Sequence, residues 1–410
     1  MKIVDVRARE ILDSRGNPTV SCSLILDDGT YVDASVPSGA SVGAHEALEL
    51  RDGGQRFAGK GVQKAIDIIH TIITPVLMGR MINAPQMDQE LALLDPSPQK
   101  STLGANATLA VSMALYKAHA SMLGVELYSF IAHTLELDEI AMPVPLVNMI
   151  NGARHAHNNL SIQEYLVIPY GALSFTQSVE QAFDITQALK KLLKKKNKEL
   201  SIGDEGGFAC AFTGNSEPFD YLVQAIENAG YGEHEFALGI DVAASEFYNA
   251  SAQNYKLADK LVSSEEMVSF FKELVDQYPL IYIEDGLDQD DWHGWRLLKK
   301  ELGEKTRIVG DDLLTTSYDR VQRALTEDAI NGVILKPNQI GTVTECLRVA
   351  QLCKKHNLVT VASHRSGETC DTFIADLALG IDAHYIKCGG LSRGERVAKY
   401  NRFLQIESMR

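Results

Sequence analysis

The second half of the chain repeats one pattern, a short apolar run that ends in an ionisable residue. The residues that end these runs are Asp241, Glu284, Asp311, Lys336, His364 and Lys387. They are separated by 43, 27, 25, 28 and 23 residues, and a strand, a helix and their two loops take about 25 to 30 residues. Amphipathic stretches lie between the runs, at 292–302, 318–325 and 342–356. The pattern predicts one repeated strand–helix unit.

Parallel strands joined by helices form either an open sheet or a closed barrel. An open sheet gathers its ligands at one switch point, whereas a barrel builds its site from the carboxyl ends of many strands. All six ionisable residues fall at such ends, and no GxGxxG sequence follows a strand. We therefore predict an α/β fold with a C-terminal TIM-like βα barrel.

The first part of the chain has a different pattern. Residues 20–26 and 30–36 are extended runs separated by an Asp-Asp-Gly turn, which predicts a hairpin. Residues 65–78 and 104–123 carry apolar residues at helical spacing. Strands followed by helices predict an α+β domain.

The domain division follows from a change in local pattern. The Met-Pro-Val-Pro segment at 142–145 cannot continue a helix. We therefore expect an N-terminal α+β domain at 1–125, a linker at 126–142 and the barrel with its site at 143–410.

The composition limits the partners that the chain can have. It contains 39 Lys and Arg against 54 Asp and Glu, a net charge of −15, which disfavours nucleic acid. The lysine-rich segment 190–198 ends an amphipathic helical pattern, so we interpret it as a solvated helix end. No stretch of about 18 apolar residues predicts a membrane span. Six cysteines without a CxxC pair are typical of free thiols in a cytoplasmic protein.

Closing the barrel would bring Asp241, Glu284 and Asp311 together at one mouth. Carboxylates this close repel one another unless a cation lies among them. Oxygen ligands alone favour a hard ion, and Mg²⁺ is the expected choice. Each acid could instead cap a helix or pair with a cation at the rim. That interpretation is the simpler one for any single acid and the weaker one for all three.

Cationic side chains end or follow the other runs. They are Lys336, His364, Arg365 and Lys387. A lysine near divalent ions and other cations has a lowered pKa, so its neutral amine could act as a base. Clustered cations also favour an anionic substrate. Together these groups predict proton abstraction next to a carboxylate, with a metal stabilising the resulting dianion.

Long motifs resemble those of the enolase family, the phosphopyruvate hydratases, over nearly the whole chain. They are DSRGNPTV (13–20), PSGAS (37–41), HEALELRDG (45–53), LGANA (103–107), QEY (163–165), GDEGGFA (203–209), DVAASEFY (241–248), IEDGLDQDDW (283–292), VGDDL (309–313), LKPNQIGTVTE (335–345), ASHRSGET (362–369) and GERVAKYN (394–401). A Lys or His base with one or two Mg²⁺ ions is a known feature of the enolase superfamily. The resemblance implies reversible dehydration of 2-phospho-D-glycerate to phosphoenolpyruvate, with two Mg²⁺ ions per active site.

The resemblance also implies a role for each matching residue. The implied metal ligands are Asp241, Glu284 and Asp311 for the first ion and Ser41 for the second. The implied catalytic residues are Lys336 as the base at C2, Glu205 as the acid at C3, Glu164 beside it, and His155. The implied substrate contacts are His155, Glu164, His364, Lys387 for the carboxylate, and Arg365 and Ser366 for the phosphate.

Three further expectations concern Glu205 as the acid, Ser366 as a phosphate contact and the loop at 37–43. Repulsion from Glu164 could keep a proton on Glu205. Ser366 precedes an amphipathic run, so we expect it at a helix start, where backbone N–H groups favour phosphate. The glycines of the loop at 37–43 suit a lid that closes over the substrate.

Several positions depart from the family pattern. Val42 replaces a threonine, Ala153 replaces a glycine, and Pro337 directly follows the implied base. This proline restricts the preceding lysine to extended backbone, as at a strand end. Cys370 and Cys388 are expected near the mouth, which gives the hypothesis that oxidation lowers activity. Two inert side chains are the simpler alternative.

Two other interpretations of the function stay open. One is a different lyase or isomerase of the enolase superfamily, against which Ser41, His155, Glu205 and Arg365 argue. The other is a catalytically weakened binding protein, which would have no physical need for clustered acids. The resemblance also implies a homodimer or an octamer of dimers, and a cytoplasmic protein with a secondary cell-surface or secreted pool left open.

Overall fold

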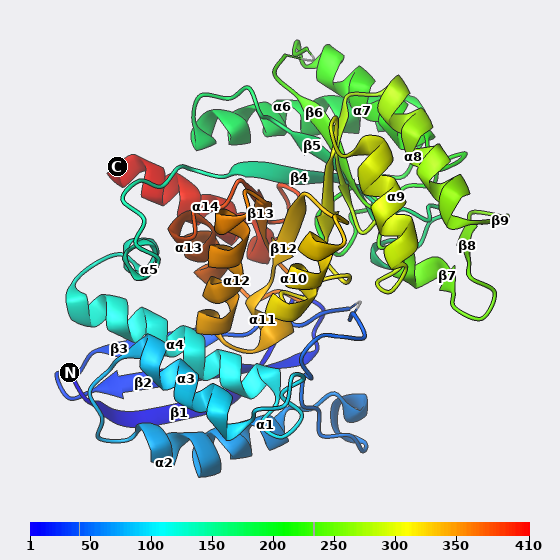
Figure 1. The fold of residues 1–410 in the computed structure, drawn as a ribbon. Helices are drawn as coiled ribbons and strands as arrows, with labels where there is room; N and C mark the ends of the chain where they lie inside the picture. Colours follow the sequence, from blue (N-terminus) through cyan, green and yellow to red (C-terminus); the bar gives the residue numbers. More distant parts are fainter. Residues whose placement is uncertain (41, 233) are drawn as a thin grey trace.

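The computed structural model describes residues 1–40, 42–232 and 234–410. In this part of the chain, an N-terminal antiparallel sheet with its helices lies against a closed barrel ringed by further helices (Figure 1). The predicted fold, a TIM-like barrel preceded by an α+β domain, is confirmed. Across the same described residues, no helix is long and apolar enough to cross a membrane.

The N-terminal sheet is built around its middle strand. Its strands are β1 (Ile3–Leu12), β2 (Pro18–Leu26) and β3 (Tyr31–Ser35). The predicted hairpin is the β2–β3 pair, and the strand that the sequence analysis did not predict, β1, pairs antiparallel with β2. The helices of this part are α1 (Gln63–Ile68), α2 (Thr74–Leu77), α3 (Ala84–Leu94), α4 (Ala105–Leu123) and α5 (Leu127–Thr134). The alanine-rich α4 is almost wholly buried and packs on β2 and β3, which its small side chains allow.

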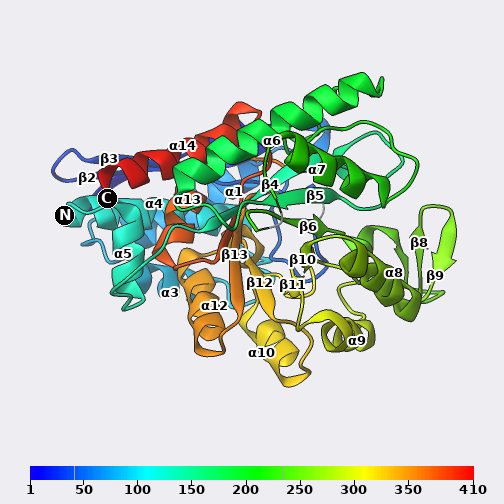
Figure 2. The same cartoon turned by 90° about the horizontal axis from the view of Figure 1, so that it is seen from above.

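The barrel is closed by eight strands in the described residues. In spatial order they are β4 (Val144–Asn151), β5 (Glu164–Ile168), β6 (Ala237–Asp241), β10 (Leu280–Glu284), β11 (Arg307–Gly310), β12 (Gly332–Leu335), β13 (Val359–Ser363) and β14 (Tyr385–Lys387). The helices that follow the barrel strands are α6 (Phe175–Lys195), α7 (Glu217–Asn228), α8 (Ser264–Gln277), α9 (Trp292–Leu302), α10 (Tyr318–Thr326), α11 (Pro337–Ile340), α12 (Val343–Lys355), α13 (Phe373–Gly380) and α14 (Gly394–Met409). Figure 2 shows them around the strands.

Strand β5 departs from the predicted parallel pattern. It runs antiparallel to both β4 and β6, because the chain returns through the short connection 152–163 instead of through a helix.

The longest interval in the repeat, between Asp241 and Glu284, also has a structural cause. It contains a separate small sheet of β7 (Tyr248–Asn249), β8 (Asn254–Leu257) and β9 (Lys260–Val262) before α8.

Strand alternation aligns the ionisable residues inside the barrel. The interior holds a small apolar cluster of Leu146, Leu166, Ile168, Ala237, Tyr282, Val309, Ile334, Val359 and Val361. Because successive side chains of a strand point to opposite faces, the residue two positions further along faces the interior again. After Tyr282, Val309 and Ile334 these residues are Glu284, Asp311 and Lys336. The apolar cluster therefore forms the floor beneath the charged mouth.

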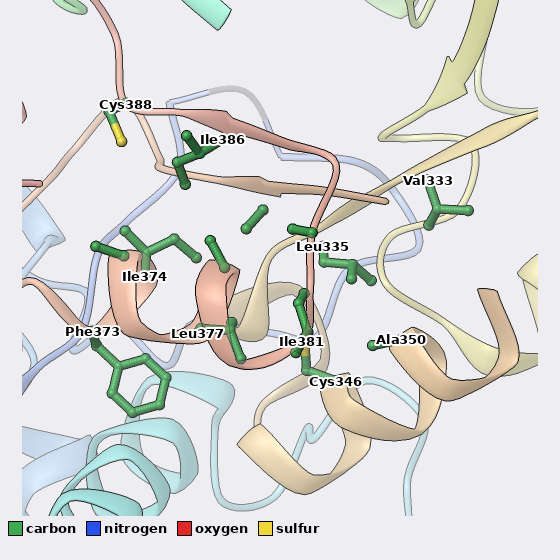
Figure 3. Packing of buried hydrophobic residues seen from close by; sticks show 14 of the residues in the cluster. Val333, Leu335, Cys346, Ala350, Phe373, Ile374, Leu377, Ile381, Ile386 and Cys388 are labelled. Atoms are coloured by element: carbon green, nitrogen blue, oxygen red, sulfur yellow. The ribbon is translucent and has the colours of Figure 1, made fainter. Parts of the chain in front are cut away.

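The remaining core lies between the strands and the helices outside them. In the region around α12 and α13, Leu335 and Ile386 from the barrel strands belong to one buried cluster with Ile374, Leu377 and Cys346 (Figure 3). These strand residues alternate with the interior-facing ones, so both faces of the strands are buried. Burial on both faces fixes the register that brings the charged residues to one end.

A buried carboxylate links the N-terminal helices to the barrel. Asp88 of α3 accepts hydrogen bonds from Ser112 Oγ of α4 at 2.7 Å, and from the backbone N and Oγ1 of Thr344 of α12 at 3.0 and 2.9 Å. Burial raises the pKa of Asp88 to about 6, although these hydrogen bonds act in the opposite direction. This contact is therefore sensitive to protonation.

We predict that Asp88→Asn changes the pH dependence of stability. A carboxyl whose pKa is raised on folding stabilises the protein most below its unfolded value of 3.8, and this contribution is lost as the pH rises through about 6. Between pH 4 and pH 7 the unfolding free energy of the unmodified protein should therefore fall by about 2 kcal/mol relative to that of the variant. Denaturant unfolding at several pH values measures this difference, and a difference that does not vary with pH would contradict the prediction.

Candidate active site

Lys387 lies among carboxylates at the carboxyl ends of the strands. Its Nζ is 3.0 Å from Asp241 Oδ2, 2.8 Å from Glu284 Oε1 and 3.2 Å from Glu164 Oε1. Burial lowers the pKa of Lys387, but these carboxylates outweigh it and raise that pKa well above its usual value. Asp241 and Glu284 are register partners on β6 and β10, so their proximity is set by the sheet itself.

Lys336 is paired with Asp311 in the same mouth. Its Nζ donates a hydrogen bond to Asp311 Oδ2, and Gln339 Nε2 donates to Asp311 Oδ1 at 2.8 Å. Lys336 has an extended backbone with φ −128° and ψ 103°, and Pro337 occupies the first turn of α11. The extended backbone predicted from the proline is confirmed, and a proline at a helix start loses no hydrogen bond.

The lowered pKa expected for Lys336 beside divalent ions stays a prediction, and in the protein alone this pKa is raised. Burial lowers this pKa, yet the carboxylates of Asp311 and then Glu284 leave it raised overall. Burial likewise raises the pKa of Asp311, and Lys336 more than offsets this, so that carboxyl is left with a lowered pKa. A different cation on Asp311, in place of this ammonium group, would favour the neutral amine of Lys336.

The three predicted first-ion ligands offer the oxygen donors that a hard divalent cation prefers. Asp241, Glu284 and Asp311 come from neighbouring strands, are buried, and offer only carboxylate oxygens. Ammonium groups already contact all three, so the oxygens face a position where positive charge is favourable. The predicted second-ion ligand, Ser41, lies outside the described residues.

Asp285 supports one of these ligands. Its carboxylate accepts the backbone N–H groups of Asp311 and Asp312 at 2.8 and 2.7 Å. The contact holds the turn after β11, and thus the direction of the Asp311 side chain. Burial and the neighbouring acids Asp312 and Asp311 raise the pKa of Asp285 well above its usual value.

A second acidic group lies beside Lys387. Glu164 is the register partner of Asp241 at the start of β5, and one carboxylate oxygen of Glu164, one of Glu205 and a ring nitrogen of His364 lie within 4.8 Å of one another. His155 Nε2 is 3.5 Å from Glu205 Oε1. The structure thus brings these four predicted site residues together.

Burial and repulsion raise the pKa of one member of this acidic pair, Glu164. Burial and then the charge of Glu205 raise the pKa of Glu164 well above its usual value, with Lys387 acting in the opposite direction. The retained proton expected on Glu205 stays a prediction. Both carboxyl groups are buried, and the nearby charge of Asp241 also raises the pKa of Glu164. The pair is best described as sharing one proton.

The predicted phosphate contacts are joined to the N-terminal domain. Arg365 Nη1 and Nη2 donate to the two carboxylate oxygens of Glu46 at 2.9 and 3.1 Å. Ser366 Oγ accepts the backbone N–H of Ala40 at 2.7 Å. Ser38 and Gly367 exchange two backbone hydrogen bonds of 2.7 and 2.8 Å. The glycine-containing loop expected to act as a lid is therefore attached to the phosphate contacts.

Ser366 does not lie at a helix start. The next helix, α13, begins at Phe373, so that expectation was wrong. Backbone groups after Ser366 are used elsewhere, since Glu368 O accepts from Ser14 N at 2.7 Å and Thr369 O accepts from Lys399 Nζ at 2.5 Å. A segment whose carbonyls bond to other elements cannot form a helical turn.

Sequence reasoning missed several residues that hold this site together. They are Glu46, Asp285, Gln339 and Arg396. All four lie inside the motifs quoted above, which was the available signal. Their partners are as far away as 319 residues in the chain, and no local pattern predicts such pairs.

The two cysteines expected near the mouth differ in exposure. Cys388 is 1% exposed, and burial raises the pKa of its thiol to about 12. A buried, protonated thiol is a poor target for oxidants, so Cys388 does not fit the oxidation hypothesis. Cys370 is exposed, and for it the hypothesis stays a prediction.

The fold and the mouth define an enzyme of the βα-barrel class with buried acids and lysines converging on one site. Residues 3–131 match the enolase N-terminal domain family, and residues 139–409 match the enolase C-terminal TIM barrel domain family. The chain is 47% identical to "Enolase" of Helicobacter pylori (strain HPAG1) over 413 residues, which covers 99% of this chain and 96% of that protein. "Enolase" of Helicobacter acinonychis (strain Sheeba) is 46% identical with the same coverage. The chain belongs to the enolase family, whose members use Mg²⁺.

Ala153 occupies a backbone conformation that favours glycine. Its φ is +45°, in the left-handed region, at the start of the 3-10 turn Ala153–His155 that carries a predicted site residue. A side chain in this region costs about 1–2 kcal/mol. The departure from the family pattern at this position therefore leaves local strain.

We predict that Ala153→Gly stabilises the protein by about 1 kcal/mol, because relief of the strain exceeds the extra freedom of glycine in the unfolded chain. The unfolding free energy from denaturant titration measures the change. The matched control is Ala188→Gly in the middle of α6, which should destabilise by about 1 kcal/mol. Destabilisation at both positions would contradict the prediction.

Proposed function

We propose that this chain catalyses the reversible dehydration of 2-phospho-D-glycerate to phosphoenolpyruvate at the barrel mouth. The observation that carries the proposal is the convergence of three buried carboxylates, two lysines and a carboxylate–histidine group in one place. Burying so many ionised groups is costly unless they act on a bound ligand or ion. The activity is that of phosphopyruvate hydratase, a carbon–oxygen lyase.

Substrate binding uses the cationic side of the mouth. Arg365 and Ser366 bind the phosphate, and Lys387 contacts the carboxylate. The hydrogen bond from Ala40 N to Ser366 Oγ supports this arrangement, because it joins the loop that closes over the substrate to a phosphate contact. Closure would exclude water from the reacting atoms.

The first proton transfer takes place at C2. Lys336 removes the C2 proton, and the two electrons of the broken C–H bond pass into the adjoining carboxylate group. Mg²⁺ held by Asp241, Glu284 and Asp311, with a second ion held partly by Ser41, would supply the positive charge that this dianion needs. Lys387 adds a further positive charge on the same side.

The second transfer takes place at C3, where hydroxide is a poor leaving group. The C3–O bond breaks as the C2–C3 double bond forms, and the shared proton of Glu164 and Glu205 passes through Glu205 to the departing oxygen, which leaves as water. His155 and His364 lie beside this acid. Their positions support a role in orienting the substrate hydroxyl.

Two further parts of the proposal rest on family membership. We expect the chain to assemble as a homodimer or an octamer of dimers, and to act in the cytoplasm with a secondary cell-surface or secreted pool left open. A weakened binding protein and a superfamily lyase with another substrate are the alternatives. Formation of phosphoenolpyruvate from 2-phosphoglycerate, measured with and without a chelator, separates the three.

We predict that Lys336→Met lowers kcat/KM for 2-phosphoglycerate by about 10³- to 10⁴-fold, because a general base of this kind contributes up to that factor. Steady-state absorbance of phosphoenolpyruvate measures the loss. The matched control is Lys260→Met on exposed β9, which should keep full activity. An unchanged rate for the Lys336 variant would refute its role as base.

We predict that removing Mg²⁺ with a chelator abolishes turnover and that adding Mg²⁺ restores it. Asp311→Asn should raise the Mg²⁺ concentration for half-maximal activity at least tenfold, since a charged ligand is lost. Equilibrium dialysis should give one ion per chain without substrate and two with a substrate analogue. Full activity in the chelator would contradict the proposal.

A further inference from the structure

We propose that Arg396 is a positioning residue that fixes the tautomer of His364, and so the direction of one hydrogen bond beside the acidic pair. The inference rests on the proposed function of His364 and Glu205. Arg396 lies in the first turn of α14, 32 residues after His364 in the sequence, and is 0% exposed. The N–H groups of a fully buried arginine need hydrogen-bond acceptors in the protein.

The tautomer follows from the chemistry of the contact. Arg396 Nη1 is 2.6 Å from His364 Nδ1. A guanidinium group can only donate hydrogen bonds, so Nδ1 must accept and cannot carry a proton. The neutral ring then has its N–H on Nε2. Burial, followed by the charge of Arg396, also lowers the pKa of His364 well below its usual value, which keeps the ring neutral.

The Nε2 nitrogen of His364 faces the acidic pair. It is 4.0 Å from Glu205 Oε1. With its N–H fixed there, His364 presents a donor towards Glu205 and cannot accept the proton of that carboxyl. A hydrogen bond between them needs the two atoms to approach by about 1 Å. The fixed N–H has a second consequence. Glu164, Glu205 and His364 have donor atoms close enough to hold a metal ion, but a protonated nitrogen cannot be a ligand. The carboxyl groups of Glu164 and Glu205 thereby stay free of metal and available for proton transfer.

The same guanidinium joins the loops on either side of the substrate position. It donates to the carbonyl oxygens of Arg365 and Ser366, both at 2.6 Å, and of Asp204 at 3.2 Å. Among the described residues its nearest carboxylate oxygen is Glu395 Oε1, 3.5 Å from Nε. Its short contacts are thus with an imidazole and three carbonyls, a pattern typical of a residue that orients loops and not of a stabilising ion pair.

Nitrogen NMR of the Mg²⁺-saturated protein, labelled with ¹⁵N in its histidines, tests the tautomer directly. The His364 signals are assigned by their loss in His364→Gln. We expect a bare Nδ1 and a protonated Nε2, and the opposite pattern or a doubly protonated ring would overturn the proposal. This result does not depend on turnover, so it is distinguishable from a failure of the proposed function.

Kinetics of Arg396 variants test the consequence. Arg396→Met, which has no donor, should lower kcat by about 10- to 100-fold, as other losses of orienting partners do, and should give mixed tautomer signals for His364. Arg396→Lys keeps a donor and should recover part of kcat and the Nε2–H signal. The matched control is Arg402→Met on the same helix, which pairs with Asp376 and should leave kcat and the His364 signals unchanged.

Two results would overturn this part of the proposal. One is an Arg396→Met variant with unchanged kcat and an unchanged tautomer. The other is an equal loss of kcat in Arg402→Met, which would indicate general loosening of α14. If Arg396→Met does not fold, Arg396→Lys and the spectrum of the unmodified protein still decide the question.

Discussion

The structure depends on pairing buried charges of opposite sign inside a barrel. Lys387 contacts Asp241, Glu284 and Glu164, and Lys336 contacts Asp311, with every partner buried. An uncompensated charge at such depth would cost several kcal/mol. The apolar floor beneath these charges and the core outside the barrel strands are two separate clusters of buried residues. The apolar clusters fix where each charge lies, and the pairing of opposite charges allows the mouth to stay buried.

Strand periodicity explains why so much of this mouth could be predicted. A residue that ends a parallel barrel strand lies at the same edge as its neighbours, so Asp241, Glu284, Asp311, Lys336 and Lys387 could be grouped from the sequence alone. Glu164 could not be grouped in this way, because it begins the antiparallel strand β5. An antiparallel strand starts at the edge where parallel ones end. Only the family resemblance placed Glu164 beside the others.

The details that the sequence did not predict are contacts between distant segments. Glu46 meets Arg365 across 319 residues, and Arg396 meets the loop of His364 from the last helix. Neither pair changes the hydrophobic periodicity of the sequence, because each involves only one polar residue in a helix or loop. The helix expected at Ser366 failed for the same reason: its backbone groups bond to other elements. Tertiary partners, not local propensity, decided that segment.

The contact between Lys336 and Asp311 affects how Lys336 could serve as a base among the carboxylates of the barrel mouth. Asp311 holds Lys336 in its ammonium form, so the two roles predicted for them, ligand and base, exclude each other while they remain paired. A divalent cation on Asp311 would compete with the ammonium group for the same oxygens and favour release of its proton. Pro337 keeps the lysine backbone extended during such a change, and Gln339 keeps the carboxylate in place. Binding of the ion and activation of the base would therefore be linked through a single carboxylate.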